Sequence, residues 1–131
     1  MYKSLVEEIL NEVKTIAIVG CSASPQKAAH QVPKYLQEKG YKIIPINPSA
    51  KEILGEKVFT SLNDLNGKVD LVLVFRPSEE TPIVTKQAVG QTKYIWFQLG
   101  IENESAEEIA KAAGIPIIMN KCIMVEHKAL F

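Results

Sequence analysis

The apolar residues of this chain gather in short runs that alternate with amphipathic stretches. Most runs are apolar at nearly every position rather than at alternate ones, which is typical of parallel strands buried on both faces. The run at 58–59 would add only a short strand. The segments predicted as strands are 14–19, 41–46, 58–59, 70–75, 93–97 and 115–119.

Apolar residues recur at helical spacing in the first two intervening segments. Residues 4–13 carry an apolar stripe, with Ser4 as the predicted N-cap and Glu7 as its capping-box partner. A second helix is expected to begin near 28–30 and to end at 39. A later start is favoured because Pro33 is tolerated mainly near the beginning of a helix.

Two further helices are expected in the second half of the chain. One covers 81–89, with Thr81 as the predicted N-cap, and the other runs from a cap at Ser105 through Ala113. The tail at 120–131 is expected to be ordered around 123–125.

Strands and helices alternate from start to finish. This pattern predicts an α/β fold: a Rossmann-like, doubly wound parallel sheet in three layers, forming a single domain over residues 1–131. The expected strand order is 3-2-1-4-5. Strand order then reverses between 15–19 and 70–75, where ligands of such sheets bind.

Composition excludes several classes of partner. The 131 residues carry 15 basic and 15 acidic side chains, so no bulk charge attracts nucleic acid or a membrane surface. No apolar run approaches the roughly 20 residues that span a bilayer. Two separated cysteines make no disulfide framework, and the beginning of the chain lacks a signal-peptide layout. We expect a cytoplasmic protein.

Polar and conformationally special residues follow each main strand. The carboxyl ends of parallel strands meet at one edge of a sheet, so these segments are expected to converge on a single site. Gly20 permits a sharp turn after the first strand, next to the start of a helix, where free backbone N–H groups favour an anion. The converging segments are Gly20–Ser22, Asn47–Pro48, Arg76–Ser78, Gln98–Gly100 and Asn120–Cys122.

The same segments narrow the choice of ligand. Gly20 stands alone where a dinucleotide fingerprint would carry three glycines, and strand two ends in Asn47 rather than in a carboxylate. Both features disfavour NAD. A missing carboxylate suits a ligand with a phosphate on its ribose, as in coenzyme A (CoA) or NADP. A Walker loop is absent.

Several motifs together resemble a known family. The matching segments include Ile18–Ser22, Pro25–Lys27, Ile46–Pro48, Val74–Glu79, Trp96–Ile101 and Asn120–Ile123. In these segments the chain resembles the small stand-alone CoA-binding domain family, which is similar to the N-terminal CoA domain of succinyl-CoA synthetase alpha subunits and of ADP-forming acyl-CoA synthetases. The resemblance covers nearly the whole chain and implies CoA or an acyl-CoA as the ligand.

The predicted phosphate site is the loop after the first strand. Its backbone N–H groups would hold the pyrophosphate, and Lys27 would add positive charge. Arg76, the single arginine of the chain, suits planar bidentate phosphate contacts. His30 stands where the family commonly has glycine or serine and would crowd this side. The loop residues assigned to the site are Gly20, Cys21, Ser22, Ser24, Pro25 and Lys27.

The remaining candidate residues come from the other strand ends. Those after strand two would flank the adenosine ribose or its phosphate, and Phe75 with Pro77 would pack against adenine or the pantetheine arm. The residues from the last two strand ends would line the pantetheine channel. The full set is Asn47, Pro48, Phe75, Arg76, Pro77, Gln98, Leu99, Gly100 and Asn120.

The sequence shows no nucleophile–base pair and no metal-ligand spacing. The related synthetases place their phosphorylated histidine in a domain that does not match this chain. The prediction is therefore a CoA-binding or sensing module, or a subunit of a larger complex or homo-oligomer. The alternatives are an NADP-dependent oxidoreductase and a protein-interaction scaffold. Cys21 or Cys122 could also form a mixed disulfide with the CoA thiol.

Overall fold

A parallel sheet forms the centre of the molecule. The computed structural model describes residues 1–131 and contains a five-stranded sheet in the order β2-β1-β5-β6-β7, all parallel. This confirms the predicted Rossmann-like α/β fold in a single domain. The strands are β1 (Thr15–Val19), β2 (Lys42–Ile46), β5 (Val69–Val74), β6 (Thr92–Phe97) and β7 (Ile117–Ile118).

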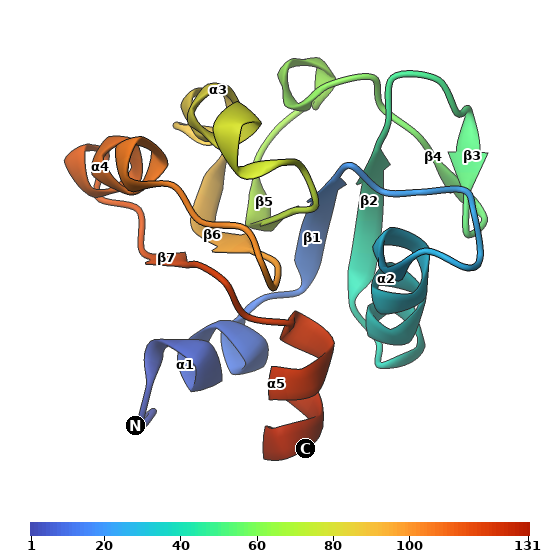
Figure 1. Ribbon diagram of the computed structural model, residues 1–131. Coiled ribbons are helices and arrows are strands. Elements are labelled where there is room, and N and C mark those ends of the chain that lie inside the picture. The colour runs from blue at the N-terminus through green and yellow to red at the C-terminus, as the bar shows by residue number, and fades with distance from the viewer.

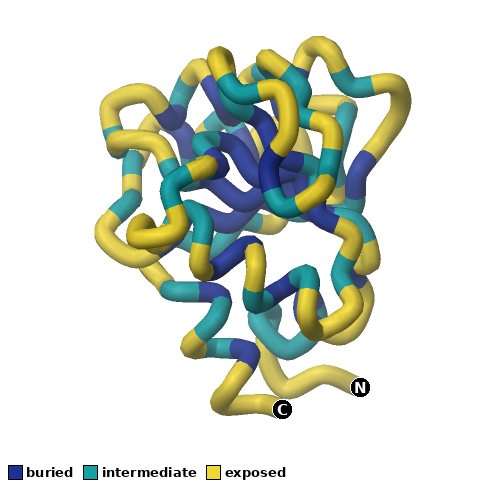
Figure 2. The backbone as a smooth tube through the Cα atoms, turned by 90° about the vertical axis from the view of Figure 1, so that its right-hand side faces the viewer, coloured by how far each residue is buried: buried dark blue, intermediate teal, exposed yellow.

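Helices cover both faces of this sheet (Figure 1). One face packs against α1 (Leu5–Glu12), α2 (Ala28–Glu38) and α5 (Ile123–Leu130). The other packs against α3 (Thr81–Ala88) and α4 (Glu104–Ala112). The buried residues therefore gather in the centre of the molecule, and the exposed residues surround them, as Figure 2 shows.

The short strand predicted at 58–59 is reduced to one contact. Phe59 forms a single parallel bridge with Ile46 at the outer side of β2. The segment before it, to which the sequence analysis assigned no element, is a hairpin of β3 (Glu52–Ile53) and β4 (Glu56–Lys57). Leu54 and Gly55 both have positive φ, at 53° and 77°, as a type I′ turn requires.

Two helix caps differ from the prediction. The α4 helix begins two residues earlier than expected, because the Asn103 side chain accepts the N–H of Ala106 at 2.9 Å and takes the N-cap position from Ser105. The Thr81 hydroxyl donates to the Ser78 carbonyl, so Thr81 lies inside α3 and does not cap it. A short 3-10 turn, η2 (Ser78–Glu80), leads into α3 instead. At α1, Ser4 accepts the N–H of Glu7 as predicted.

The tail is more ordered than the sequence predicted. Residues 123–130 form the complete helix α5, anchored by Ile123, which is fully buried, and by His127, which is 7% exposed. The Tyr35 hydroxyl of α2 pairs with His127 Nδ1 at 2.7 Å, and the His127 ring stacks on Phe131. Burial, assisted by the charge of Lys39, lowers the pKa of His127 and favours the neutral ring.

Asp70, near the start of β5, is hydrogen-bonded to the start of β1. This is the amino-terminal edge of the sheet, opposite the carboxyl ends of the strands. Asp70 Oδ2 accepts the N–H groups of Lys14 at 2.8 Å and Thr15 at 3.1 Å. Burial acts to raise the pKa of Asp70, but these two hydrogen bonds and the Lys93 ammonium outweigh it and lower the net pKa.

We expect Asp70→Asn to destabilise the protein by about 1–2 kcal/mol at pH 7, since two charge-assisted hydrogen bonds are weakened. Because the folded pKa is depressed, the stabilisation is present above the unfolded value of about 3.9 and is lost as pH falls through the folded value. Urea unfolding should therefore show that the difference in free energy of unfolding between wild type and variant, present at pH 7, disappears below about pH 4. A gap that is constant with pH would contradict this role.

Candidate functional site

A cavity of about 460 Å³ lies at the carboxyl ends of β1, β2 and β5, where strand order reverses. It is bounded by α3 and by the 3-10 turn η1 (Leu62–Asp64). Its 16 lining residues are Val19, Gly20, Cys21, Ser22, Lys27, Ile46, Asn47, Pro48, Thr60, Ser61, Leu62, Arg76, Glu80, Ile83, Val84 and Gln87. Seven predicted site residues are therefore brought together here.

Gly20 forms the turn between β1 and the cavity. Its φ of +85° lies in the region that favours glycine, and a Cβ at this position would approach the Phe75 carbonyl oxygen to 2.8 Å. The same Cβ would lie 3.0 Å from Cδ of Arg76. Gly20 thus lets the end of β1 approach the end of β5 closely, which positions Arg76.

The loop after Gly20 is anchored to α2 through the Ala29 carbonyl, which has no helical partner because of Pro33. Pro33 has no N–H and cannot bond the Ala29 carbonyl four residues earlier in α2. The Ser22 N–H donates to that carbonyl at 3.0 Å instead. His30 Nδ1 then donates to the Ser22 carbonyl at 2.7 Å, so the His30 ring fastens the loop and is not among the residues that line the cavity.

Asn47 links the ends of β1 and β2. Its Nδ2 donates to the Cys21 carbonyl at 2.9 Å, and its Oδ1 accepts the N–H groups of Ser49 and Ala50 at 2.8 and 2.9 Å. Both ends of the Asn47 amide are therefore hydrogen-bonded within the chain. Asn47 lines the cavity, and its side chain connects the loops after β1 and β2.

The free backbone donors differ from those the sequence indicated. The N–H of Gly20 bonds the Ile46 carbonyl, and that of Ser22 bonds Ala29 as described. The N–H groups of Ala28 and Ala29, in the first turn of α2, make no hydrogen bond within the chain. The anion-binding potential of the loop lies there, next to Lys27.

The charged side chains in the cavity wall are Lys27, Arg76 and Glu80. Arg76 forms a forked contact with Glu80, with Arg76 Nη2 at 3.0 Å from both carboxylate oxygens. Lys27 makes no ion pair within the chain. The cavity is thus weakly cationic, which suits an anionic ligand.

Cys21 is fully buried at the base of this site. Burial raises the pKa of its thiol to about 12, against a smaller opposing effect from the Ser22 backbone. The thiol is therefore protonated at neutral pH and belongs to the core. Cys122, half-buried, precedes α5 and does not line the cavity.

Nine lining residues were not assigned to the site by the sequence analysis. Seven of them come from the segments around η1 and α3, and the other two, Val19 and Ile46, end β1 and β2. Leu62 and Val84 form part of the apolar floor, and Ile83 is 64% exposed. Neither segment is a strand end, so the rule of converging strand ends could not find them. A solvent-exposed isoleucine on an otherwise amphipathic helix is the one signal in the sequence that could have pointed here.

Four predicted residues near the cavity are not in its wall. Ser24 donates its hydroxyl to Gln26 Oε1 within the loop, and Pro25 is exposed. Phe75 packs against the core face that carries α1, α2 and α5. Pro77 is exposed between β5 and η2.

Another four predicted residues, at the ends of β6 and β7, lie outside the cavity. Gln98 is 5% exposed, and its Oε1 accepts the N–H of Ile123, which holds the start of α5. Asn120 Oδ1 accepts the Gly100 N–H at 2.7 Å. Leu99 is 68% exposed. Through these hydrogen bonds, Gln98 and Asn120 connect the ends of β6 and β7 and the start of α5.

Comparison with known proteins resolves what kind of domain carries this site. Residues 14–128 match the family model described as the CoA binding domain. The chain belongs to this CoA binding domain family.

Relatives of this CoA binding domain protein include small and large proteins. It is 41% identical over 126 residues to the uncharacterized protein YneT of Bacillus subtilis, covering 95% of this chain and 93% of that one. It is 32% identical to an ADP-forming acetate–CoA ligase of Methanocaldococcus jannaschii, covering 84% of this chain but only 17% of the ligase. A hypothetical protein from Pyrococcus horikoshii has a similar structure, with a TM-score of 0.91 and 39% identity over 95% of this chain and 89% of that one.

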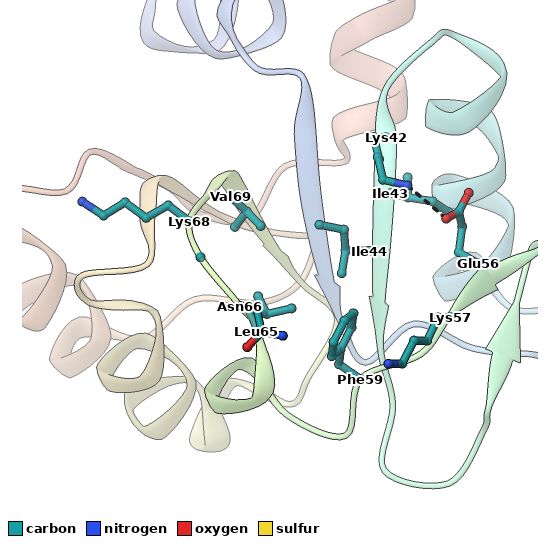
Figure 3. Close-up of a pocket in the computed structure, with 11 residues that line it drawn as sticks. Lys42, Ile43, Ile44, Glu56, Lys57, Phe59, Leu65, Asn66, Lys68 and Val69 are labelled. Carbon is teal, nitrogen blue, oxygen red and sulfur yellow. Dashed lines mark hydrogen bonds and ion pairs between the residues drawn. The ribbon is translucent and has the colours of Figure 1, made fainter.

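A second hollow of about 280 Å³ lies elsewhere on the molecule (Figure 3). Ile44, Phe59 and Leu65 converge on it, with Lys42 paired to Glu56 at 3.2 Å on its rim. It includes the first residues of β2 and β5, and so lies toward the amino ends of the strands. Ligands of open parallel α/β sheets generally bind at the opposite edge, at the carboxyl ends of the strands.

Two structural findings bear on other kinds of ligand. No three His, Cys, Asp or Glu side chains cluster in a way that could hold a metal ion. No helix combines the length and apolarity needed to cross a bilayer.

Proposed function

We propose that this protein binds CoA or an acyl-CoA in the cavity at the carboxyl ends of β1, β2 and β5. The observation that carries the proposal is the position of Arg76 and Lys27 around that cavity, in a chain of the CoA binding domain family. CoA carries several negatively charged phosphate groups, an adenine ring and a flexible pantetheine arm. The cavity offers it two cations, free helix N–H groups and an apolar floor.

The residues present fit the two ends of the ligand differently. Lys27 and Arg76 would hold phosphate groups, while Pro48, Leu62 and Val84 provide apolar surface for the adenosine end. The pantetheine arm would extend along the strand ends toward Leu99, as the sequence analysis predicted. Gln98 would support this channel from behind, because its side chain is already bonded to Ile123.

The role we infer is that of a binding or sensing module, or of a subunit in a larger complex. The cysteine in the cavity wall supports this, because the raised pKa of Cys21 makes it a poor nucleophile at neutral pH. What the acetate–CoA ligases do belongs to much longer chains, of which this one matches a small part. We place the protein in the cytoplasm.

We expect CoA, and not NADP, to raise the melting temperature. A ligand that binds only the folded state at about 100 times its Kd stabilises that state by about 2.7 kcal/mol. Differential scanning fluorimetry with CoA, acetyl-CoA and NADP at matched concentrations measures the effect.

The same experiment separates the two alternatives. A shift with NADP and none with CoA would contradict the proposal and favour an oxidoreductase. No shift with any nucleotide would favour a protein-interaction scaffold. Mass spectrometry of protein purified without added ligand would identify any retained acyl chain.

A further inference from the structure

A carboxylate occupies one edge of the arginine in the cavity. Arg76 Nε donates to Glu80 Oε1 at 3.1 Å, and Nη2 donates to Oε1 and Oε2, both at 3.0 Å. Glu80 is the one acidic residue among the 16 that line the cavity. The contact is therefore part of the binding site and not of a remote surface.

This edge of the guanidinium is one that a phosphate can use. Carboxylate and phosphate both accept two parallel hydrogen bonds from the planar fork of an arginine. The Nε and Nη2 donors cannot serve Glu80 and a ligand phosphate in the same geometry at once. A ligand that takes this edge must displace the Glu80 carboxylate.

Stability alone gives little reason for this pair. The two side chains are 44% and 47% exposed, and exposed ion pairs of this kind contribute little to folding. Arg76 also precedes η2 and is not in a helix with Glu80, so helical spacing does not impose the contact. Pro77 and the η2 turn bring the carboxylate back toward Arg76.

We propose that Glu80 is an internal competitor for the Arg76 guanidinium, which a phosphate of the ligand displaces on binding. This inference rests on the proposed function. In the free protein, Glu80 neutralises Arg76 and holds its fork at the cavity. In the complex, a phosphate that carries up to two negative charges replaces a carboxylate that carries one. The exchange lowers affinity and disfavours ligands without a phosphate.

The test is the affinity of CoA for Glu80→Gln, measured by isothermal titration calorimetry. We expect the Kd to fall about fivefold, because glutamine retains the size of the side chain but competes weakly for the guanidinium. Glu79→Gln is the matched control: it removes the same charge from the adjacent exposed residue, which does not line the cavity. Its Kd should stay within about twofold of wild type.

The Arg76→Ala background separates competition from general repulsion. Competition predicts that Glu80→Gln has no effect on the Kd once Arg76 is absent. An equal gain in both backgrounds would show simple charge repulsion and overturn the proposal. An unchanged or higher Kd for Glu80→Gln alone would also overturn it, because Glu80 would then only position Arg76.

A spectroscopic signal reports the exchange directly. Arg76 is the single arginine of the chain, so its Nε–H group gives one assignable NMR resonance. CoA should shift this resonance in the wild type, and Glu80→Gln should shift it before any ligand is added. Wild-type protein that fails to bind CoA would contradict the proposed function itself. Wild-type binding with an unperturbed Nε–H signal would contradict only the competition.

Discussion

Gly20→Ala is expected to lower the free energy of unfolding by about 2–4 kcal/mol. The left-handed backbone at φ +85° costs a non-glycine residue about 1–2 kcal/mol, and the new Cβ would lie 2.8 Å from the Phe75 carbonyl oxygen. Backbone must shift to relieve that contact. Urea denaturation measures this loss of free energy, with the two proteins analysed at a common m-value.

Gly90→Ala is the matched control for this substitution. Its φ of +82° is nearly the same, but a Cβ there meets nothing within 4 Å. It should therefore carry the conformational cost alone, about 1–2 kcal/mol. If the two variants lose equal stability, the close approach of β1 to β5 at Gly20 is not the constraint that we describe.

The second large effect is expected on binding and not on folding. Arg76→Ala should raise the Kd for CoA about 10- to 100-fold, because hydrogen bonds to a charged group are lost from the cavity. Its effect on stability should stay within about 0.5 kcal/mol, since the ion pair with Glu80 is exposed. Calorimetric titration and thermal unfolding of the same sample separate the two effects.

Arg76→Lys refines this prediction. Lysine keeps the positive charge but lacks the planar fork, so we expect an intermediate Kd. An alanine variant that binds CoA as tightly as wild type would exclude Arg76 from the site. A variant that loses binding and folding together would instead assign Arg76 a structural role through its contact with the Gly20 turn.

These expectations depend on features that the sequence showed to different degrees. The strand runs were predictable because a sheet covered on both faces requires nearly continuous apolar residues, as in β1 and β5. The positions of Gly20, Lys27 and Arg76 near one another were predictable from the loops that follow β1 and β5, and all three line the cavity. The cap at Asn103 was missed because Ser105 offers an equally good local signal, and only geometry decides between them.

The tail shows why some elements could not be predicted. The α5 helix has little periodicity of its own and depends on contacts far along the chain, such as the pairing of His127 with Tyr35 and of Ile123 with Gln98. The hairpin around Leu54 was missed because a leucine rarely adopts positive φ. In both cases tertiary contacts outweigh local preference.

The sequence by itself determined the layered α/β architecture, the family of the domain, and the edge of the sheet at which the cavity lies. Those properties follow from periodicity, chain order and motifs, which are local or topological. Only the tertiary structure decided which strand ends share a cavity and which polar atoms remain free. Asn47 and Gln98 are bonded within the chain, whereas Arg76 meets Glu80, because hydrogen-bond partners depend on distances in space that the order of residues does not specify.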